Sequence, residues 1–369
     1  MRKQLLLLGT LLAMLIPVAA FAAGEEYEKL PIVVLTYSEA LALALEDVPA
    51  IQNLENRIAE LQKERNDLNE AYRLTRWQIS AAAADGLRSQ ITELNRQIEH
   101  MSLEIDTIKL RREQALINAI AVIANAAIDI ETAEASIVIT SEQVRRTGRL
   151  HSFGFASASE LRIAQARLTQ EQVNLDNLLI TKANGLSTLN HLLGQPVYQQ
   201  TYVELERELP EIPGNLTNHI ESTVLQAPSI RQMRFDIYRR REDMAQHRAV
   251  YRYLGVSPRR NCETCQALQS AYDIAVLQQT TAIRAMDTAL RAAYNNLEQL
   301  QNQESAARLA LGQAEEALQI AQTNFELGRV TQFEIDSALF SIFSAQQAIE
   351  RILNQQWVMM LVLENPALL

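Results

Sequence analysis

The sequence has few residues that interrupt helices and few aromatic residues. Its 369 residues include 9 Pro and 11 Gly, aromatic residues make up 5%, and no proline lies between Pro49 and Pro196. Proline breaks a helix interior and glycine weakens it, so their scarcity permits very long helices. Because few aromatic side chains are available to fill a thick core, the composition favours long helices joined along thin apolar seams.

The sequence also lacks the motifs that mark enzymes, cofactor sites and nucleic-acid binders. It contains no glycine-rich phosphate loop and no nucleophile elbow. No pair of its five histidines has metal-ligand spacing: His100, His151, His191, His219 and His247. Its 34 basic and 44 acidic residues give a net charge of −10, which argues against a nucleic-acid partner. We therefore expect no enzyme activity, no cofactor and no nucleic acid.

Only two cysteines are present, and they form the segment Cys262-Glu263-Thr264-Cys265. A single CxxC without a second pair is weak evidence for zinc. In an exported protein the simplest interpretation is a local disulfide, with an intermolecular or redox role and a metal site as the alternatives. We therefore expect a disulfide here and no metal site.

The first 22 residues have the pattern of a secretory signal peptide. Arg2 and Lys3 precede an apolar run from Leu5 to Ala20, and Ala20-Phe21-Ala22 fits a small-x-small cleavage site. No stretch of about 18 uncharged apolar residues, the length that a membrane helix needs, follows it. We therefore expect an exported protein of the cell envelope.

Apolar residues recur with alternating three- and four-residue spacing over much of the chain. One series runs from Ile51 to Tyr72, and another begins at Leu87 and continues to Ile108. Sustained heptads of this kind predict coiled-coil packing. We expect long helices over residues 87–147, 157–193, 266–327 and from the second reversal to 364, short helices over 37–47 and 216–226, and a helix end and turn at 80–86. Residues 197–203 are compatible with a short strand, which the sequence does not decide.

Two short segments share one pattern of a glycine, a hydroxyl residue and an acid. They are Phe153-Gly154-Phe155-Ala156-Ser157-Ala158-Ser159-Glu160 and Leu327-Gly328-Arg329-Val330-Thr331-Gln332-Phe333-Glu334. The glycine can end one helix at positive φ, and the Ser or Thr can cap the next helix in a capping box with the Glu. Each segment therefore predicts a tight reversal between two helices.

The spacing of these segments indicates an internal duplication. Pro228 lies 179 residues after Pro49, and Gly328 lies 174 residues after Gly154. We expect a first helical hairpin repeat over residues 23–195, a proline-containing linker over 196–215, and a second repeat over 216–369. The predicted fold class is all-α, with two tandem repeats of long antiparallel coiled-coil hairpins.

One end of the second repeat is strongly basic. Only Asp236, Glu242 and Asp243 oppose nine arginines in this part of the chain. These are Arg231, Arg234, Arg239, Arg240, Arg241, Arg248, Arg252, Arg259 and Arg260. The pattern fits either a solvated helix face or a contact with an anionic membrane or wall surface.

Taken in order, these motifs resemble those of the TolC-type outer-membrane efflux proteins. The resemblance rests on Leu35-Thr36-Tyr37-Ser38-Glu39-Ala40-Leu41, on Leu192-Leu193-Gly194-Gln195-Pro196 and on the two reversals, and it extends over nearly all of the mature chain. It implies a homotrimer whose three protomers build a twelve-helix tube. It also implies an outer-membrane association, with a periplasmic adaptor and an inner-membrane transporter as partners.

The resemblance further implies roles for residues at the two reversals. The adaptor would dock at six positions: Gly154, Phe155, Ser157, Gly328, Arg329 and Thr331. Glu160 and Glu334 would form a gate at the closed end of the tube. The residues alone are equally compatible with these two glutamates acting only as helix caps.

The sequence departs from the family where its members insert paired β-strands that form an outer-membrane barrel. The corresponding segments are Arg73 to Arg88 and Tyr251 to Gln269, and neither contains two alternating runs of about 9–11 residues. We therefore expect a member without its own barrel, acting as a conduit component of an efflux or type I secretion-type assembly. The alternative is a structural coiled-coil spacer of the cell envelope without a through-channel. A wet polar stripe would favour the conduit, and its candidates are Asn66, Asn69, Asn295, Asn296, Gln299 and Gln303.

Overall fold

A computed structural model describes residues 32–197, 199–204, 216–253 and 262–365 of the chain. The predicted signal peptide at residues 1–22 lies outside the described residues. So do residues 205–215 of the predicted linker and two of the nine arginines, Arg259 and Arg260.

The described chain consists of eight helices and two short strands. In chain order they are β1 (Val33–Thr36), α2 (Tyr37–Leu45), α3 (Pro49–Thr75), α4 (Ala81–Ser152), α5 (Ala158–Leu192), β2 (Thr201–Glu204), α6 (Leu216–Gln226), α7 (Pro228–Tyr253), α8 (Glu263–Glu326) and α9 (Gln332–Glu364). The order α2-α3-α4-α5 is repeated by α6-α7-α8-α9. The all-α class predicted from the sequence is confirmed, with the two strands as a small addition.

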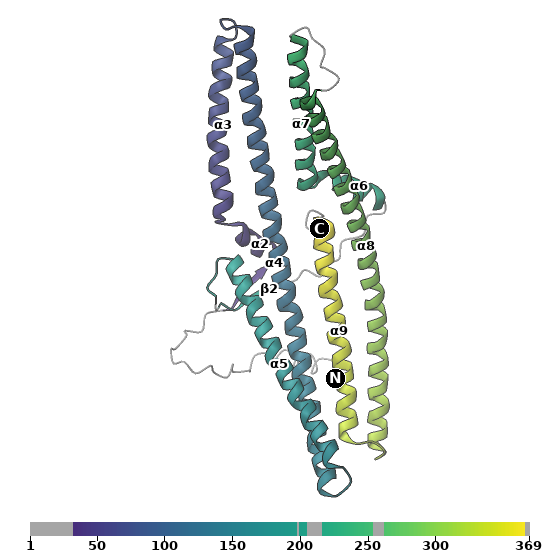
Figure 1. Cartoon of the computed structure of the whole chain (residues 1–369). Coiled ribbons are helices and arrows are strands. Elements are labelled where there is room, and N and C mark those ends of the chain that lie inside the picture. The colour runs from purple at the N-terminus through teal and green to yellow at the C-terminus, as the bar shows by residue number, and fades with distance from the viewer. Residues whose placement is uncertain (1–31, 198, 205–215, 254–261, 366–369) are drawn as a thin grey trace.

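The molecule is long and narrow because α4 and α8 run along most of its length (Figure 1). At a rise of 1.5 Å per residue, the 72 residues of α4 span about 108 Å. The turns from α4 to α5 and from α8 to α9 lie at one end, which we call the tip end (Figure 1). The turn from α3 to α4, the end of α7 and the start of α8 lie at the opposite end, which we call the blunt end (Figure 1).

The two repeats pack side by side through α4. This helix contacts α3 and α5 of its own repeat, and α9 and α7 of the second repeat. We call the contact between α4 and α9 the seam. The outer edges of the pair are then α5 and α3 on one side and α8 on the other (Figure 1).

The apolar core is concentrated at mid-length, where the short helices α2 and α6 lie against the long ones. One buried cluster joins α2, α4, α5, β2 and α9 and includes Leu116, Leu189 and Trp357. A second joins α6, α7, α8 and α9 and includes Ile220 and Leu290. Toward both ends the helices pack as thin pairs, as expected for a chain with few aromatic residues.

The undecided segment at residues 197–203 contains a strand. Its last residues belong to β2, which pairs in parallel with β1 in the register Val33 to Thr201 and Thr36 to Glu204. Asn190, which is fully buried at the end of α5, donates to the carbonyls of Val197 and Gln199 and accepts from the Thr201 hydroxyl at 2.7 Å. This single amide therefore fixes the chain that leaves the first repeat.

One expectation about the blunt end is wrong. Residues 81–86 were expected to form a helix end and turn, but they form the first turns of α4. The Ser80 hydroxyl caps this helix by accepting from the Ala83 N–H at 3.3 Å, and four alanines with high helix propensity follow it. A Cβ added at Gly86 would meet no atom within 4 Å, so this exposed glycine is tolerated inside the helix. The reversal lies earlier, after Thr75.

Within the described residues, one helix is long and apolar enough to span a membrane, namely α4. The same helix packs against α3, α5, α7 and α9. These contacts account for its apolar character, since a helix surrounded by others is apolar on several faces.

Candidate functional site

The two tips have the same backbone geometry. Gly154 has φ of 78° and Gly328 has φ of 67°. At the first tip, the Phe155 N–H donates to the Leu150 carbonyl and the Gly154 N–H donates to the His151 carbonyl. At the second, Arg329 N–H donates to Asn324 and Gly328 N–H donates to Phe325 in the same way. Both tips are therefore Schellman motifs, in which a positive-φ glycine ends the helix.

Each tip then starts its next helix with a capping acid. The Ser157 N–H donates to Glu160 Oε2 at 2.6 Å, and the Glu160 N–H donates back to Ser157 Oγ at 3.2 Å. At the second tip, both the N–H and the hydroxyl of Thr331 donate to Glu334 Oε2, at 2.5 and 3.0 Å. These backbone and side-chain hydrogen bonds lower the pKa of both carboxyl groups below the usual value for glutamate. Each glutamate thus binds the start of its own helix.

Large apolar side chains are exposed around both tip glycines. Phe155 is 81% exposed and Phe153 is 74% exposed, and Leu327 is exposed at the second tip. Exposed apolar residues gathered at the end of a rigid hairpin are typical of a contact surface. The sequence pointed to Phe155 here but not to Phe153 or Leu327, although both flank the glycines.

A groove of about 490 Å³ lies beside the second tip, between the end of α4 and the start of α9. Arg145, Arg146 and Arg149 line it from α4, and Phe333 and Asp336 line it from α9. The Arg146 guanidinium lies over the Phe333 ring, 5.5 Å from its centroid, and it adds to the lowering of the Glu334 pKa. The groove connects the two repeats at the tip end and makes this surface basic.

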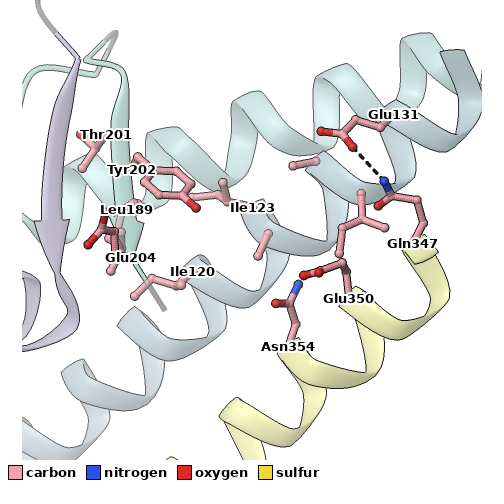
Figure 2. A pocket seen from close by; sticks show the side chains of 14 residues that line it. Ile120, Ile123, Glu131, Leu189, Thr201, Tyr202, Glu204, Gln347, Glu350 and Asn354 are labelled. Carbon is pink, nitrogen blue, oxygen red and sulfur yellow. Dashed lines mark hydrogen bonds between the residues drawn. The ribbon is translucent and has the colours of Figure 1, made fainter. Parts of the chain in front are cut away.

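A second groove, of about 550 Å³, lies at mid-length along the seam. Ile120 and Ile123 of α4 contribute apolar surface, while Glu350 and Asn354 of α9 and Tyr202 of β2 contribute polar groups (Figure 2). At its edge, Gln347 Nε2 donates to Glu131 Oε2 at 3.0 Å (Figure 2). The seam is therefore partly open and polar on this side.

The two cysteines lie at the blunt end and are separate thiols in the structure. Cys262 is the N-cap of α8, and its sulfur accepts from the Cys265 N–H at 3.2 Å. Its sulfur also lies 3.7 Å from His247 Nε2 and 3.6 Å from Tyr251 Oη, both on α7. The hydrogen bonds from Cys265, His247 and Tyr251 lower the pKa of the Cys262 thiol to about 6, while the pKa of Cys265 is raised.

This arrangement differs from the disulfide that we expected between Cys262 and Cys265. The bridge itself remains a prediction for oxidising conditions. Sequence spacing did not connect His247 with the cysteines, because it lies 15 residues before Cys262 on another helix. The signal that could have found it is the antiparallel turn from α7 to α8, which returns the chain to the face of His247 and Tyr251.

The blunt end is basic and carries one exposed aromatic ring. The exposed arginines of α7 are Arg231, Arg234, Arg239, Arg240, Arg241 and Arg248. Glu242 forms an ion pair with Arg96 of α4, which ties α7 to the first repeat. Trp77, in the turn after α3, is 82% exposed, and Arg76 lies over its ring at 4.6 Å. Sequence reasoning did not single out Trp77.

No protein-family model matches this chain, and no curated protein sequence does so either. Solved structures do match it in fold. The outer membrane protein VceC from Vibrio cholerae is 14% identical, with a TM-score of 0.63 over 90% of this chain and 95% of VceC. The Campylobacter jejuni CmeC outer membrane channel is 11% identical, with a TM-score of 0.64 over 96% of this chain and 94% of CmeC. A membrane protein from Pseudomonas aeruginosa is 15% identical, with a TM-score of 0.64 over 90% and 93%.

These similarities establish the fold. They cover almost the whole of this chain and of each channel, so the two hairpin repeats, rather than a single coiled coil, are what is shared. The fold implied by the resemblance to TolC-type proteins is therefore confirmed.

Proposed function

We propose that this protein is an exported, non-enzymatic conduit component of an efflux or type I secretion-type assembly in the cell envelope, associated with the outer membrane. Three copies would close into a twelve-helix tube that docks a periplasmic adaptor at its tip end. The observation that carries the proposal is the seam between α4 and α9, because the same contact can be repeated between neighbouring copies.

The repeat order explains why the seam can recur. Within one chain, the long helix of the first repeat, α4, packs against the return helix of the second, α9. The long helix of the second repeat, α8, contacts only elements of its own repeat among the element pairs with substantial contact. The return helix α5 likewise contacts only α4 and β2. A second copy that brings its α5 against α8 would complete the pattern and bury both edges.

Both edges carry apolar side chains that lack cover in one protomer. On α5 these are Ile163, Val173, Leu179 and Ile180, and on α8 they are Ile274, Leu277, Leu309 and Ile320. Rows of exposed apolar residues on long helices are unusual in a monomer and favour burial by another copy. A head-to-tail contact of this kind closes into a ring when the rotation per copy permits. The number three comes from the resemblance to TolC-type channels.

The repeat offset gives the residue pairs that the new contact should form. The caps of the two tips are separated by 174 residues, from Ser157 to Thr331. On the seam, Arg351 of α9 pairs with Asp129 of α4. Shifting both positions by 174 residues places Asn177 of α5 beside Gln303 of α8 in the next copy. Both residues are exposed in the protomer.

The tip end supports adaptor docking. Gly154, Phe155 and Ser157 form one tip, and Gly328, Arg329 and Thr331 form the other. The exposed Phe153 and Phe155 provide an apolar surface, and the groove lined by Arg145, Arg146 and Arg149 provides positive charge. A helical hairpin with an apolar seam and acidic flanks would complement this surface. Glu160 and Glu334 would lie near the tube axis and add gating to their capping role.

A tube needs a wet inner face, whereas a structural spacer does not. The six polar candidates Asn66, Asn69, Asn295, Asn296, Gln299 and Gln303 are all exposed in the protomer. This exposure is consistent with a polar stripe and favours the conduit over a spacer without a through-channel.

Disulfide cross-linking tests the ring directly. In a Cys262→Ser, Cys265→Ser background, the pair Asn177→Cys and Gln303→Cys should give covalent dimers and trimers after mild oxidation. The matched control is Asp129→Cys with Arg351→Cys, which should close within one chain. If the control pair closes and the edge pair gives no product between chains, the repeated seam is wrong.

The blunt end supports a contact with an anionic membrane surface. Arginines on α7 and the exposed Trp77 with Arg76 lie at this end, and tryptophan and arginine together favour the membrane interface. The mature protein should float with vesicles containing anionic lipid and not with purely zwitterionic vesicles. Trp77→Ala should reduce the bound fraction without changing helicity. Equal binding to both vesicle types would contradict this contact.

A further inference from the structure

We propose that His247, Cys262 and Cys265 form a binding site for a thiophilic divalent metal ion, with Zn²⁺ as the best match. The site lies at the blunt end, where the end of α7 meets the start of α8. It is independent of the conduit proposal, because it rests only on the local geometry of one protomer.

The three ligand atoms already lie close enough to share one ion. His247 Nε2 or Nδ1 and the two cysteine sulfurs all lie within 4.8 Å of one another. Zn–S bonds of about 2.3 Å and Zn–N bonds of about 2.0–2.1 Å in a tetrahedron separate ligand atoms by roughly 3.5–3.8 Å. The distance from Cys262 Sγ to His247 Nε2 is 3.7 Å. Small side-chain rotations would therefore bring all three ligands to one ion.

The secondary structure holds these ligands in place. Cys262 and Cys265 are the N-cap and N3 residues of α8, so the first helical turn presents both sulfurs on one side. His247 and Tyr251 are one turn apart on α7, and their rings form an edge contact at 5.3 Å between centroids. This contact restricts the orientation of the imidazole. Each helix thus supplies a fixed part of the site, and the half-buried ligands leave the fourth position open to solvent or to Tyr251.

The charge of the site suits a divalent cation. Two thiolates neutralise Zn²⁺, so the bound site would carry no net charge beside the arginines of α7. Without an ion, a second thiolate beside the first is opposed by repulsion between like charges. Zinc also favours two sulfurs and one imidazole over the oxygen ligands that calcium and magnesium require.

Metal binding would fasten α7 to α8 at the blunt end. The bound ion would link the last turns of α7 to the first turn of α8, which otherwise meet there only through side-chain contacts. A local disulfide would use the same two sulfurs and leave no thiolate for the ion. The two states are therefore mutually exclusive, and the reduced protein is the metal-binding form.

The test uses the mature chain, reduced and kept free of oxygen, with Co²⁺ as a spectroscopic probe and Zn²⁺ as its competitor. We expect one Co²⁺ per chain, a thiolate-to-cobalt charge-transfer band, and loss of that band when Zn²⁺ is added. Cys262→Ser and Cys265→Ser should abolish the band. His247→Ala should weaken Co²⁺ binding by roughly 10–100-fold. The control His151→Ala, at the opposite end, should bind as the unmodified chain does.

The spectrum of the unmodified chain decides the matter even if a variant misfolds. Absence of a charge-transfer band in reduced protein with accessible thiols would overturn the proposal, and the cysteines would then be a disulfide pair only. A band that persists unchanged in a folded His247→Ala variant would overturn the assignment of His247. Circular dichroism of each variant checks that its helices remain intact.

Discussion

Gln347 of α9 donates a hydrogen bond from Nε2 to Oε2 of Glu131 on α4, at 3.0 Å, and so joins the two repeats across the seam. Arg351, one turn later on α9, pairs with Asp129 beside it. These polar contacts lie at the edge of the seam and set its register. The buried side chains beneath them supply most of its free energy, because exposed polar pairs contribute little.

The first prediction compares these two kinds of contact. Trp357 of α9 is buried against the first repeat, and its ring meets Tyr37 of α2 edge-on at 5.6 Å between centroids. Trp357→Ala should lower the free energy of unfolding by about 3–5 kcal/mol, because it removes a large buried side chain. Arg351→Ala should lower it by at most about 1 kcal/mol. Denaturant unfolding of both variants checks this, and equal losses would contradict the division.

The second prediction concerns the tip glycines. Gly328→Ala places a Cβ on a residue with φ of 67° and should destabilise the protein by roughly 1 kcal/mol. Gly312 offers a matched control, because it lies inside α8 and an added Cβ would meet no atom within 4 Å. Gly312→Ala should therefore stabilise by roughly 0.5–1 kcal/mol. Changes of the same sign in both variants would argue against strain at the tip.

The third prediction is a pH dependence at the tips. The capping hydrogen bonds hold the pKa values of Glu160 and Glu334 below the usual glutamate value, so folding favours their charged forms. Their contribution is fully present above the unfolded pKa and is lost as pH falls through the lower, folded pKa. Hydrogen exchange at the first turns of α5 and α9, corrected for its intrinsic pH dependence, should therefore accelerate in acid.

Replacing either acid provides the control for this pH effect. In Glu334→Gln, the start of α9 should lose the acid-dependent part of its exchange, while the start of α5 should keep it. The same acid response in both helices of that variant would show that another group is responsible.

The fourth prediction separates capping from gating at Glu334. Glutamine still serves a capping box, so the melting temperature of Glu334→Gln should stay close to that of the unmodified protein. If the six glutamates of a trimer crowd the axis, removing three charges should change cation block or leak in a reconstituted conduit. Adaptor-dependent export should change with it. Unaltered conductance, adaptor binding and export in this variant would leave Glu334 as a cap alone.

Sequence reasoning predicted the parts of the fold that depend on local patterns. Glycine at C′ and a hydroxyl residue three positions later were enough to place both tips, because these motifs are complete within eight residues. The heptads and the scarcity of proline likewise predicted the long helices. The resemblance to TolC-type proteins rested on the order of such local motifs, and the fold confirms it.

The features that sequence reasoning missed depend on contacts between distant segments. β2 forms because Asn190 binds the backbone of the following chain and because β1 lies beside it, and neither fact is visible in residues 197–203. His247 joins the cysteines only after α7 and α8 fold back on each other. The start of α4 was misplaced because Gly86 was interpreted as a turn, although the Ser80 cap outweighs it.

The most direct test of the conduit is electron microscopy of the purified mature protein, viewed along and across its long axis. The account predicts threefold particles of twelve helices with a continuous axial lumen and with all tips at one end. A stable, folded monomer would contradict the tube, and a solid helical rod without a lumen would show a structural spacer instead.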